Sequence, residues 1–178
     1  MKMNYLLGIL VIFSVILFGC AQGNGTAASG NIVPSDKKSM EGKEAMMAEE
    51  GFEMMESYNG KVLAGTITPY LDFDKADYDK ALKENKIILL NFYASWCPIC
   101  RAEQQNVFSA FNDLNRKDAV GFRVNFRDSD TDADEEALAK EFGVSYQHTK
   151  IILKDGQKVL KAPDSWDKQR YLNELAKI

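Results

Sequence analysis

The sequence predicts an α/β domain in which helices flank a central mixed sheet, and three features lead to this prediction. Residues 86–93, KIILLNFY, form a nearly continuous apolar run, which is typical of a strand buried on both faces of a sheet. Helical and strand patterns alternate along the chain from residue 74 onward. The pair Asp155-Gly156 between two short strand patterns indicates an antiparallel hairpin, so the sheet should contain both strand directions.

Apolar periodicity and stop signals set the expected elements. Gly143 follows a helical segment and is a typical stop signal. The long helix after the buried strand should face the core with Val107, Phe108, Phe111 and Leu114, and the closing helix with Trp166, Tyr171, Leu172 and Leu175. In chain order, the expected elements are a strand within 61–70, a helix over 74–84, a strand over 86–93, a helix over 101–115, a strand over 119–126, a helix over 134–142, strands over 149–153 and 158–161, and a helix over 166–178.

The first twenty residues have the character of a secretory leader. Lys2 supplies a positive charge, and an uncharged apolar run follows from Tyr5 to Phe18. This run is shorter than the roughly 20 apolar residues of a membrane span and suits a signal peptide. Its end, Leu17-Phe18-Gly19-Cys20, resembles the lipobox of bacterial lipoproteins, which implies that Cys20 becomes lipid-modified. We expect residues 1–20 to be a lipoprotein signal peptide. An uncleaved membrane anchor is the alternative, and both place the remaining chain outside the cytoplasm.

Residues 21–60 differ in composition from the rest of the chain. They are first small, polar and rich in glycine, and then rich in Glu, Ala and Met. We expect a flexible Met/Glu-rich tether that joins the lipid-anchored residue to a folded domain over residues 61–178. Methionine thioethers can also bind Cu(I). No Cys or His stands nearby to complete such a site with Met40, Met46, Met47, Met54 and Met55, which favours a plain stalk.

Charge and cysteine content exclude several classes of protein. The net charge of −4 and the lack of a run of Lys and Arg argue against nucleic acid as a partner. The chain has three cysteines, too few for a disulfide framework. The domain must therefore be held together by its core, which leaves a cysteine pair available for chemistry.

Two of the cysteines stand in the segment Trp96-Cys97-Pro98-Ile99-Cys100, between the buried strand and the long helix. Proline is tolerated in the first turn of a helix, so Cys97 is expected at the helix N-terminus and Cys100 one turn in, on the same side. Unpaired N–H groups and the helix dipole favour the thiolate of Cys97. The spacing also keeps the two Cα atoms within the roughly 7 Å that a disulfide permits. Cys97 could then attack a disulfide, and Cys100 could resolve the mixed disulfide.

Two other interpretations of the pair are weaker. A structural zinc site needs four ligands, and the chain offers one such pair and a single histidine. An inert structural disulfide would leave the adjacent Trp96 and the position at the helix start unexplained.

Residues 91–100, NFYASWCPIC, resemble the active-site segment of the thioredoxin family, and the resemblance extends over roughly residues 70–178. It implies the thioredoxin fold for the domain over 61–178, thiol–disulfide exchange through Cys97 and Cys100 within the motif that includes Trp96 and Pro98, and no cofactor besides the redox-active disulfide. With the lipobox, the chain is similar to membrane-tethered thioredoxin-like proteins outside the cytoplasm. The implied partners are protein thiols and disulfides and an unidentified electron donor or acceptor.

Two positions depart from the family pattern. Asn91 stands where the family has a buried aspartate that serves proton transfer to the second thiol, and an amide can hydrogen-bond but cannot take a proton. His148 stands where the family has a cis-proline facing the cysteines. A non-proline cis bond costs about 3–4 kcal/mol, which favours a trans Gln147–His148 peptide. His148 could be structural, favour the thiolate of Cys97 as a cation, shuttle a proton, or complete a Cys-Cys-His metal site.

The acidic segment over residues 128–134, DSDTDAD, invites comparison with a calcium loop. Ala133 stands where that loop needs glycine, and Ala139 stands where it needs glutamate. We expect instead a solvated loop whose carboxylates cap the next helix and favour its N-terminus.

Three functions remain open from the sequence. The first is a thiol–disulfide oxidoreductase that acts on proteins outside the cytoplasm, as a reductase or an oxidant. The second is a copper-binding or copper-delivery module using Cys97, Cys100 and His148. The third is a redox-inert interaction domain.

Overall fold

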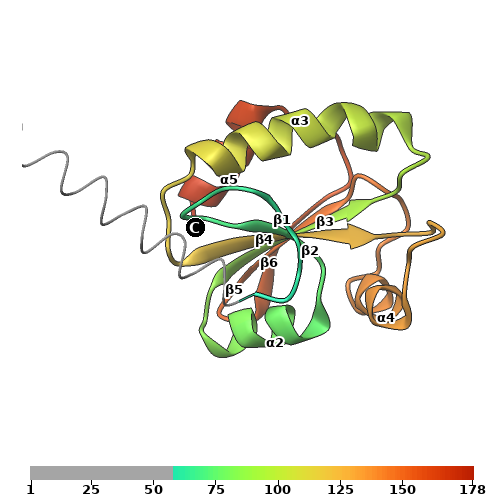
Figure 1. Cartoon of the computed structure of the whole chain (residues 1–178), viewed down its shortest axis with the longest axis horizontal. Helices are drawn as coiled ribbons and strands as arrows, with labels where there is room; N and C mark the ends of the chain where they lie inside the picture. The colour runs from blue at the N-terminus through green and yellow to red at the C-terminus, as the bar shows by residue number, and fades with distance from the viewer. Residues whose placement is uncertain (1–57) are drawn as a thin grey trace, which may run out of the picture. The chain divides into compact units, whose positions relative to one another are not determined.

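The computed structural model describes residues 58–178, which form one sheet with helices on both faces (Figure 1). The predicted signal peptide and nearly all of the predicted tether lie outside the described residues. Between residues 58 and 178, no helix is long and apolar enough to span a bilayer. In chain order, the elements are β1 (Val62–Ala64), β2 (Tyr70–Asp72), α2 (Lys75–Lys83), β3 (Ile87–Tyr93), α3 (Pro98–Asp113), β4 (Ala119–Asn125), α4 (Ala133–Glu141), β5 (Lys150–Lys154), β6 (Gln157–Ala162) and α5 (Lys168–Ala176).

Strand β3 lies near the centre of the six-stranded sheet, whose order is β1-β2-β4-β3-β5-β6. It runs parallel to β4 and antiparallel to β5, with Leu89 opposite Gly121 on one side and Ile152 on the other. The chain returns from β5 to β6 through Asp155 and Gly156, whose φ angles of 50° and 70° suit a two-residue hairpin turn. The mixed sheet that the sequence predicted is confirmed.

Helices cover both faces of the sheet, which explains why β3 is apolar along its length. Helices α3 and α5 pack on one face and contribute Phe111 and Tyr171 to its core (Figure 1). Helices α2 and α4 pack on the other face, where Tyr78 belongs to a second core. Successive β3 side chains alternate between the two cores, with Leu89 in the first and Leu90 in the second. Both residues are fully buried.

Two boundaries differ from the sequence-based expectation. The single strand expected within 61–70 is instead two short antiparallel strands. The chain turns between them at Gly65, whose φ of +79° is readily adopted by glycine. The closing helix begins after its N-cap Asp167 rather than at Trp166, because the Asp167 side chain accepts a hydrogen bond from a first-turn N–H. Trp166 still packs in the core as expected, with 1% of its surface exposed.

A buried ion pair joins α3 to β5. Glu103 pairs with Lys150, and the two side chains are 3% and 0% exposed. The Glu103 carboxylate also accepts hydrogen bonds from the Trp166 backbone N–H at 2.7 Å and the Tyr171 hydroxyl at 2.8 Å. The Lys150 ammonium donates to the His148 carbonyl at 2.9 Å. Burial lowers the pKa of Lys150, and the Glu103 carboxylate opposes that shift. One carboxylate thus connects α3, β5 and the start of the C-terminal helix.

Replacing Glu103 with alanine should lower the free energy of unfolding by about 3–5 kcal/mol, because the buried Lys150 ammonium loses its partner. The matched control is Asp113→Ala on the same helix, which breaks an exposed pair with Lys168. That change should cost less than about 1 kcal/mol. Urea unfolding followed by circular dichroism measures both losses. Equal losses in the two variants would contradict the prediction.

Candidate functional site

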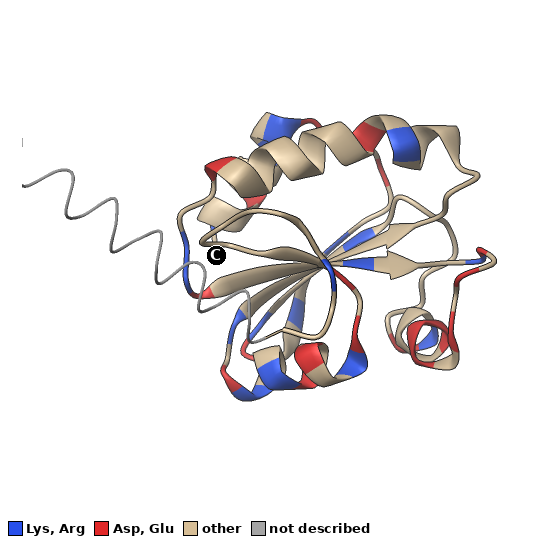
Figure 2. Ribbon diagram, viewed as in Figure 1, with Lys and Arg blue, Asp and Glu red and all other residues tan. Residues whose placement is uncertain are grey.

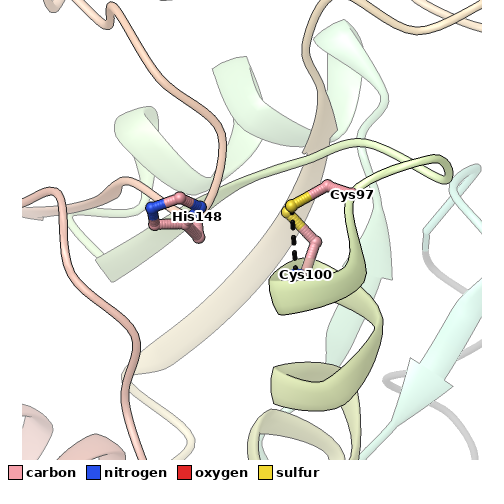
Figure 3. Close-up of side chains that lie close together, drawn as sticks. All are labelled: Cys97, Cys100 and His148. Atoms are coloured by element: carbon pink, nitrogen blue, oxygen red, sulfur yellow. Dashed lines mark hydrogen bonds between the residues drawn. The ribbon is translucent and has the colours of Figure 1, made fainter.

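The cysteine pair lies at the start of α3, shortly after the end of β3. Cys97 is the N-cap of α3, and Pro98 occupies the first turn, where its missing N–H is not needed. The Cys97 Sγ accepts a hydrogen bond from the Cys100 backbone N–H at 3.2 Å (Figure 3). Both cysteines are free thiols. The placement predicted from the sequence, with one sulfur at the helix start and the other one turn in, is therefore confirmed.

The two thiols are buried, with exposed fractions of 5% for Cys97 and 4% for Cys100. Burial raises the pKa of the Cys100 thiol to about 12, and its hydrogen bond with Cys97 adds to the shift. Cys100 is accordingly protonated at neutral pH. A thiol is a poor nucleophile, so the first attack on a disulfide falls to Cys97, at the helix N-terminus.

His148 faces the cysteine pair from the opposite side of the site (Figure 3). Its backbone N–H donates to the Phe92 carbonyl at 2.7 Å, which fixes the residue beside the end of β3. One ring nitrogen and the sulfur atoms of Cys97 and Cys100 all lie within 4.8 Å of one another. No peptide bond in residues 58–178 is cis, so the Gln147–His148 peptide is trans, as its energy favours.

The backbone and ring of His148 are both unusual. Its φ is +50°, in the left-handed region that non-glycine residues seldom adopt, although histidine enters it more readily than most. Its Nδ1 is buried and has no hydrogen-bond partner among the described residues. A strained residue with an unpaired polar atom in a site is a common mark of function.

Asn91 is a buried polar contact. The side chain is 6% exposed, and its Nδ2 donates to the Tyr70 hydroxyl at 3.0 Å. Burial raises the pKa of Tyr70 well above its ordinary value, so its hydroxyl stays protonated and neutral. Asn91 and Tyr70 therefore form a buried hydrogen bond in which neither group is charged. A carboxylate that could accept a proton is not supplied at this position, in keeping with the expectation from the sequence.

The acidic loop before α4 serves two structural purposes, and Figure 2 shows its acidic residues. Asp132 caps α4 and forms a reciprocal capping box with Glu135, which confirms the predicted capping role. Asp128 reaches back to the cysteine loop, where its carboxylate accepts hydrogen bonds from the Ser95 backbone N–H and from the Ser95 hydroxyl. The Ser95 N–H lowers the pKa of Asp128 below its ordinary value.

Arg127, the residue before the acidic loop, also holds Trp96. The indole Nε1 donates to the Arg127 carbonyl at 2.9 Å, while 55% of the Trp96 surface stays exposed. Sequence reasoning missed Asp128 and Arg127 as site residues. A signal was available: β3 and β4 are parallel neighbours, so the residues that follow them meet at one edge of the sheet.

A free dithiol at the start of a helix, next to the central strand of a mixed sheet, defines a class of thiol-bearing α/β domains. The sequence model of the family described as Thioredoxin matches residues 69–177, which is more than half of the chain. The chain belongs to the thioredoxin family. The predicted thioredoxin fold is confirmed, and the family needs no cofactor beyond its redox-active disulfide.

Individual relatives cover parts of the chain. Thioredoxin H4 of Arabidopsis thaliana is 41% identical over 85 residues, which are 46% of this chain and 62% of that protein. The thiol:disulfide interchange protein DsbE of Yersinia pestis is 41% identical over 63 residues, or 34% of this chain and 28% of that one. Each is thus matched over less than two thirds of its length. Thioredoxin from Aeropyrum pernix has a TM-score of 0.51 at 15% identity over 67% of this chain and 94% of its own, a likeness of fold.

Replacing Asp128 with alanine should loosen the cysteine loop, because the Ser95 N–H loses a charge-assisted hydrogen bond. Exchange of the Ser95 amide hydrogen, followed by NMR, should accelerate about tenfold. Asp130→Ala is the control in the same loop, since Asp130 bonds only to Ser129 among the hydrogen bonds of the described residues. Unchanged protection of Ser95 in Asp128→Ala would refute this role.

The raised pKa of Cys100 can be tested in a Cys97→Ser chain in which Cys20 is also replaced by serine. Thiolate absorbance near 240 nm should stay flat between about pH 6 and pH 9, because a thiol buried this deeply ionises only at higher pH. The Cys100→Ser chain in the same background supplies the baseline. A thiolate step in this range that is lost in the baseline chain would show that burial does not govern this thiol.

Proposed function

We propose that this protein is a thiol–disulfide oxidoreductase that exchanges disulfides with proteins outside the cytoplasm through its Cys97-Pro98-Ile99-Cys100 motif. The observation that carries the proposal is the position of Cys97. Its sulfur caps α3 and accepts a hydrogen bond from the Cys100 N–H, while the second thiol lies one turn into the helix. Helix N-termini stabilise negative charge, which is what an attacking thiolate needs.

The reaction in the reducing direction has two steps. The Cys97 thiolate attacks a substrate disulfide, so a new bond joins Cys97 Sγ to one substrate sulfur while the other leaves as a thiolate that takes up a proton. Cys100 then gives up its proton and attacks Cys97 Sγ, which closes the Cys97–Cys100 disulfide and releases the second substrate thiol. The substrate gains two electrons from the chain and two protons, one from Cys100 and one from the solvent that took the Cys97 proton when the thiolate formed, and no further cofactor takes part.

The second step requires that Cys100 lose its proton despite its raised pKa. Asn91 cannot accept that proton. The leaving substrate thiolate and water are acceptors that the reaction itself provides. His148, whose ring lies within reach of both sulfurs, is a described side chain that can carry a proton between them and solvent.

Exposed apolar side chains mark the face that a protein substrate would contact. In the described part of the chain, the exposed large apolar residues include Trp96, Ile99 and Tyr146, at 55%, 48% and 65% exposed. Trp96 and Ile99 flank Cys97, and Tyr146 lies two residues before His148. Aromatic and apolar side chains around a reactive group favour contact with an extended substrate chain.

The proposed location rests on the sequence. The apolar segment over residues 1–20 with Cys20 at its end supports secretion and a lipid anchor at the membrane, and residues 21–60 supply a tether. The similarity of one segment to a thiol:disulfide interchange protein is in keeping with work outside the cytoplasm. The electron donor or acceptor would then be another protein that reaches this face.

Reduction of insulin disulfides by the full chain, with dithiothreitol as electron source, tests the proposed activity. The wild-type chain should accelerate insulin precipitation, and Cys97→Ser should fall to the uncatalysed rate, because the attacking sulfur is lost. Cys20→Ser serves as the control, since it removes a cysteine outside the motif and should keep full activity. Equal rates for the wild-type and Cys97→Ser chains would refute the proposal.

A further inference from the structure

The geometry points to a Cu(I) site formed by Cys97, Cys100 and His148 when the cysteines are reduced. Two sulfurs and one imidazole nitrogen form a soft donor set, which favours Cu(I) over the hard ions Mg²⁺ and Ca²⁺. Binding Cu(I) is a different property from disulfide exchange, and it does not depend on that activity.

The three ligand atoms are nearly in place. They lie within 4.8 Å of one another. With metal bonds of about 2.3 Å to sulfur and 2.0 Å to nitrogen, three ligands spread evenly around one ion lie about 3.7–4.0 Å apart. Side-chain rotations that draw the three atoms together by about 1 Å would bring them onto one ion.

Two features of His148 support a ligand role over a purely structural one. Its Nδ1 is buried without a hydrogen-bond partner among the described residues. Burying this nitrogen costs free energy that no hydrogen bond in the described part of the chain offsets. Its backbone is held at φ +50°, and the Phe92 carbonyl fixes it there through a 2.7 Å hydrogen bond. The fold thus keeps the imidazole opposite the sulfurs despite the strain (Figure 3).

The number of ligands favours Cu(I) over zinc. A structural zinc site takes four protein ligands. Within residues 58–178, the group of possible ligands at this position contains only these three side chains. Cu(I) is satisfied by three soft donors, and the buried cysteines keep competing water away.

The charge around the three ligands also suits a bound Cu(I) ion. Binding removes the protons that the two thiols hold and transfers no electron, so two thiolates and one Cu(I) carry a net charge of −1. The N-terminus of α3 directs the Cys100 N–H at the Cys97 sulfur, which stabilises a negative centre. An oxidised Cys97–Cys100 pair offers no thiolates, so only the reduced protein should take up the ion.

The test measures Cu(I) affinity of the full chain, under anaerobic conditions, by competition with the chromophoric chelator bathocuproine disulfonate. All chains carry Cys20→Ser, so that a third thiol does not contribute. The key variant is His148→Asn, because asparagine also tolerates a positive φ and leaves the backbone in place, while its amide is a poor ligand for Cu(I). Gln147→Ala is the control in the same loop. Near-UV circular dichroism checks that each variant is folded.

The reduced chain should bind one Cu(I), and the oxidised chain and a Cys97→Ser/Cys100→Ser chain should not. His148→Asn should bind at least about tenfold more weakly, as the loss of even an indirect contact to a metal can do. Gln147→Ala should bind as the parent does. X-ray absorption of the parent chain should show the copper bonded to one nitrogen and two sulfurs, and in His148→Asn the nitrogen should be lost.

Three results would overturn the site: equal affinity of His148→Asn and the parent chain, retention of Cu(I) by the chain without Cys97 and Cys100, or uptake of Zn(II) with none of Cu(I). The insulin assay in metal-free buffer is scored separately. A chain that binds Cu(I) but does not reduce insulin, or the reverse, shows which of the two inferences has failed.

Discussion

The pairing of β3 with a strand on each side is the constraint from which the site follows. The strand is parallel to β4 and antiparallel to β5, so one end of the sheet receives the end of β3, the end of β4 and the beginning of β5 together. Cys97 follows β3, Asp128 follows β4, and His148 precedes β5. These residues, distant in sequence, meet because backbone hydrogen bonds fix the strand ends, as in the 2.7 Å bond from the His148 N–H to the Phe92 carbonyl.

Burial then gives the two sulfurs different chemistry. Both lie below the surface, but only Cys97 stands outside the first helical turn, with its sulfur at the N–H of Cys100. Cys100 is inside that turn, and burial raises its pKa to about 12. The same spacing that brings the sulfurs together thus separates an attacking sulfur from a protonated partner, which is the asymmetry that stepwise disulfide exchange needs.

The polar groups around the pair differ from the family pattern, and the fold accommodates them locally. Asn91 forms a neutral contact with Tyr70, and His148 takes a left-handed backbone on a trans peptide. The buried charge nearby is the pair of Glu103 and Lys150, which binds α3 to β5 and steadies the strand that follows His148. A thioredoxin-family framework therefore presents an imidazole to its cysteines, and this single change links the exchange chemistry to the proposed affinity for Cu(I).

The class of fold and the cysteine pair could be predicted from the sequence, because both rest on local patterns. The apolar run of β3, the Asp155-Gly156 turn and a proline after the first cysteine each act within a few residues of chain. The sequence also placed His148 opposite the pair through a family resemblance. Three contacts and one gap became visible only in the folded chain: Asp128 and Arg127 hold the cysteine loop, Glu103 pairs with Lys150, and the His148 Nδ1 has no hydrogen-bond partner among the described residues. Such contacts depend on strand register and on how helices pack over the sheet. They join residues far apart in the chain, so no local periodic pattern in the sequence predicts them.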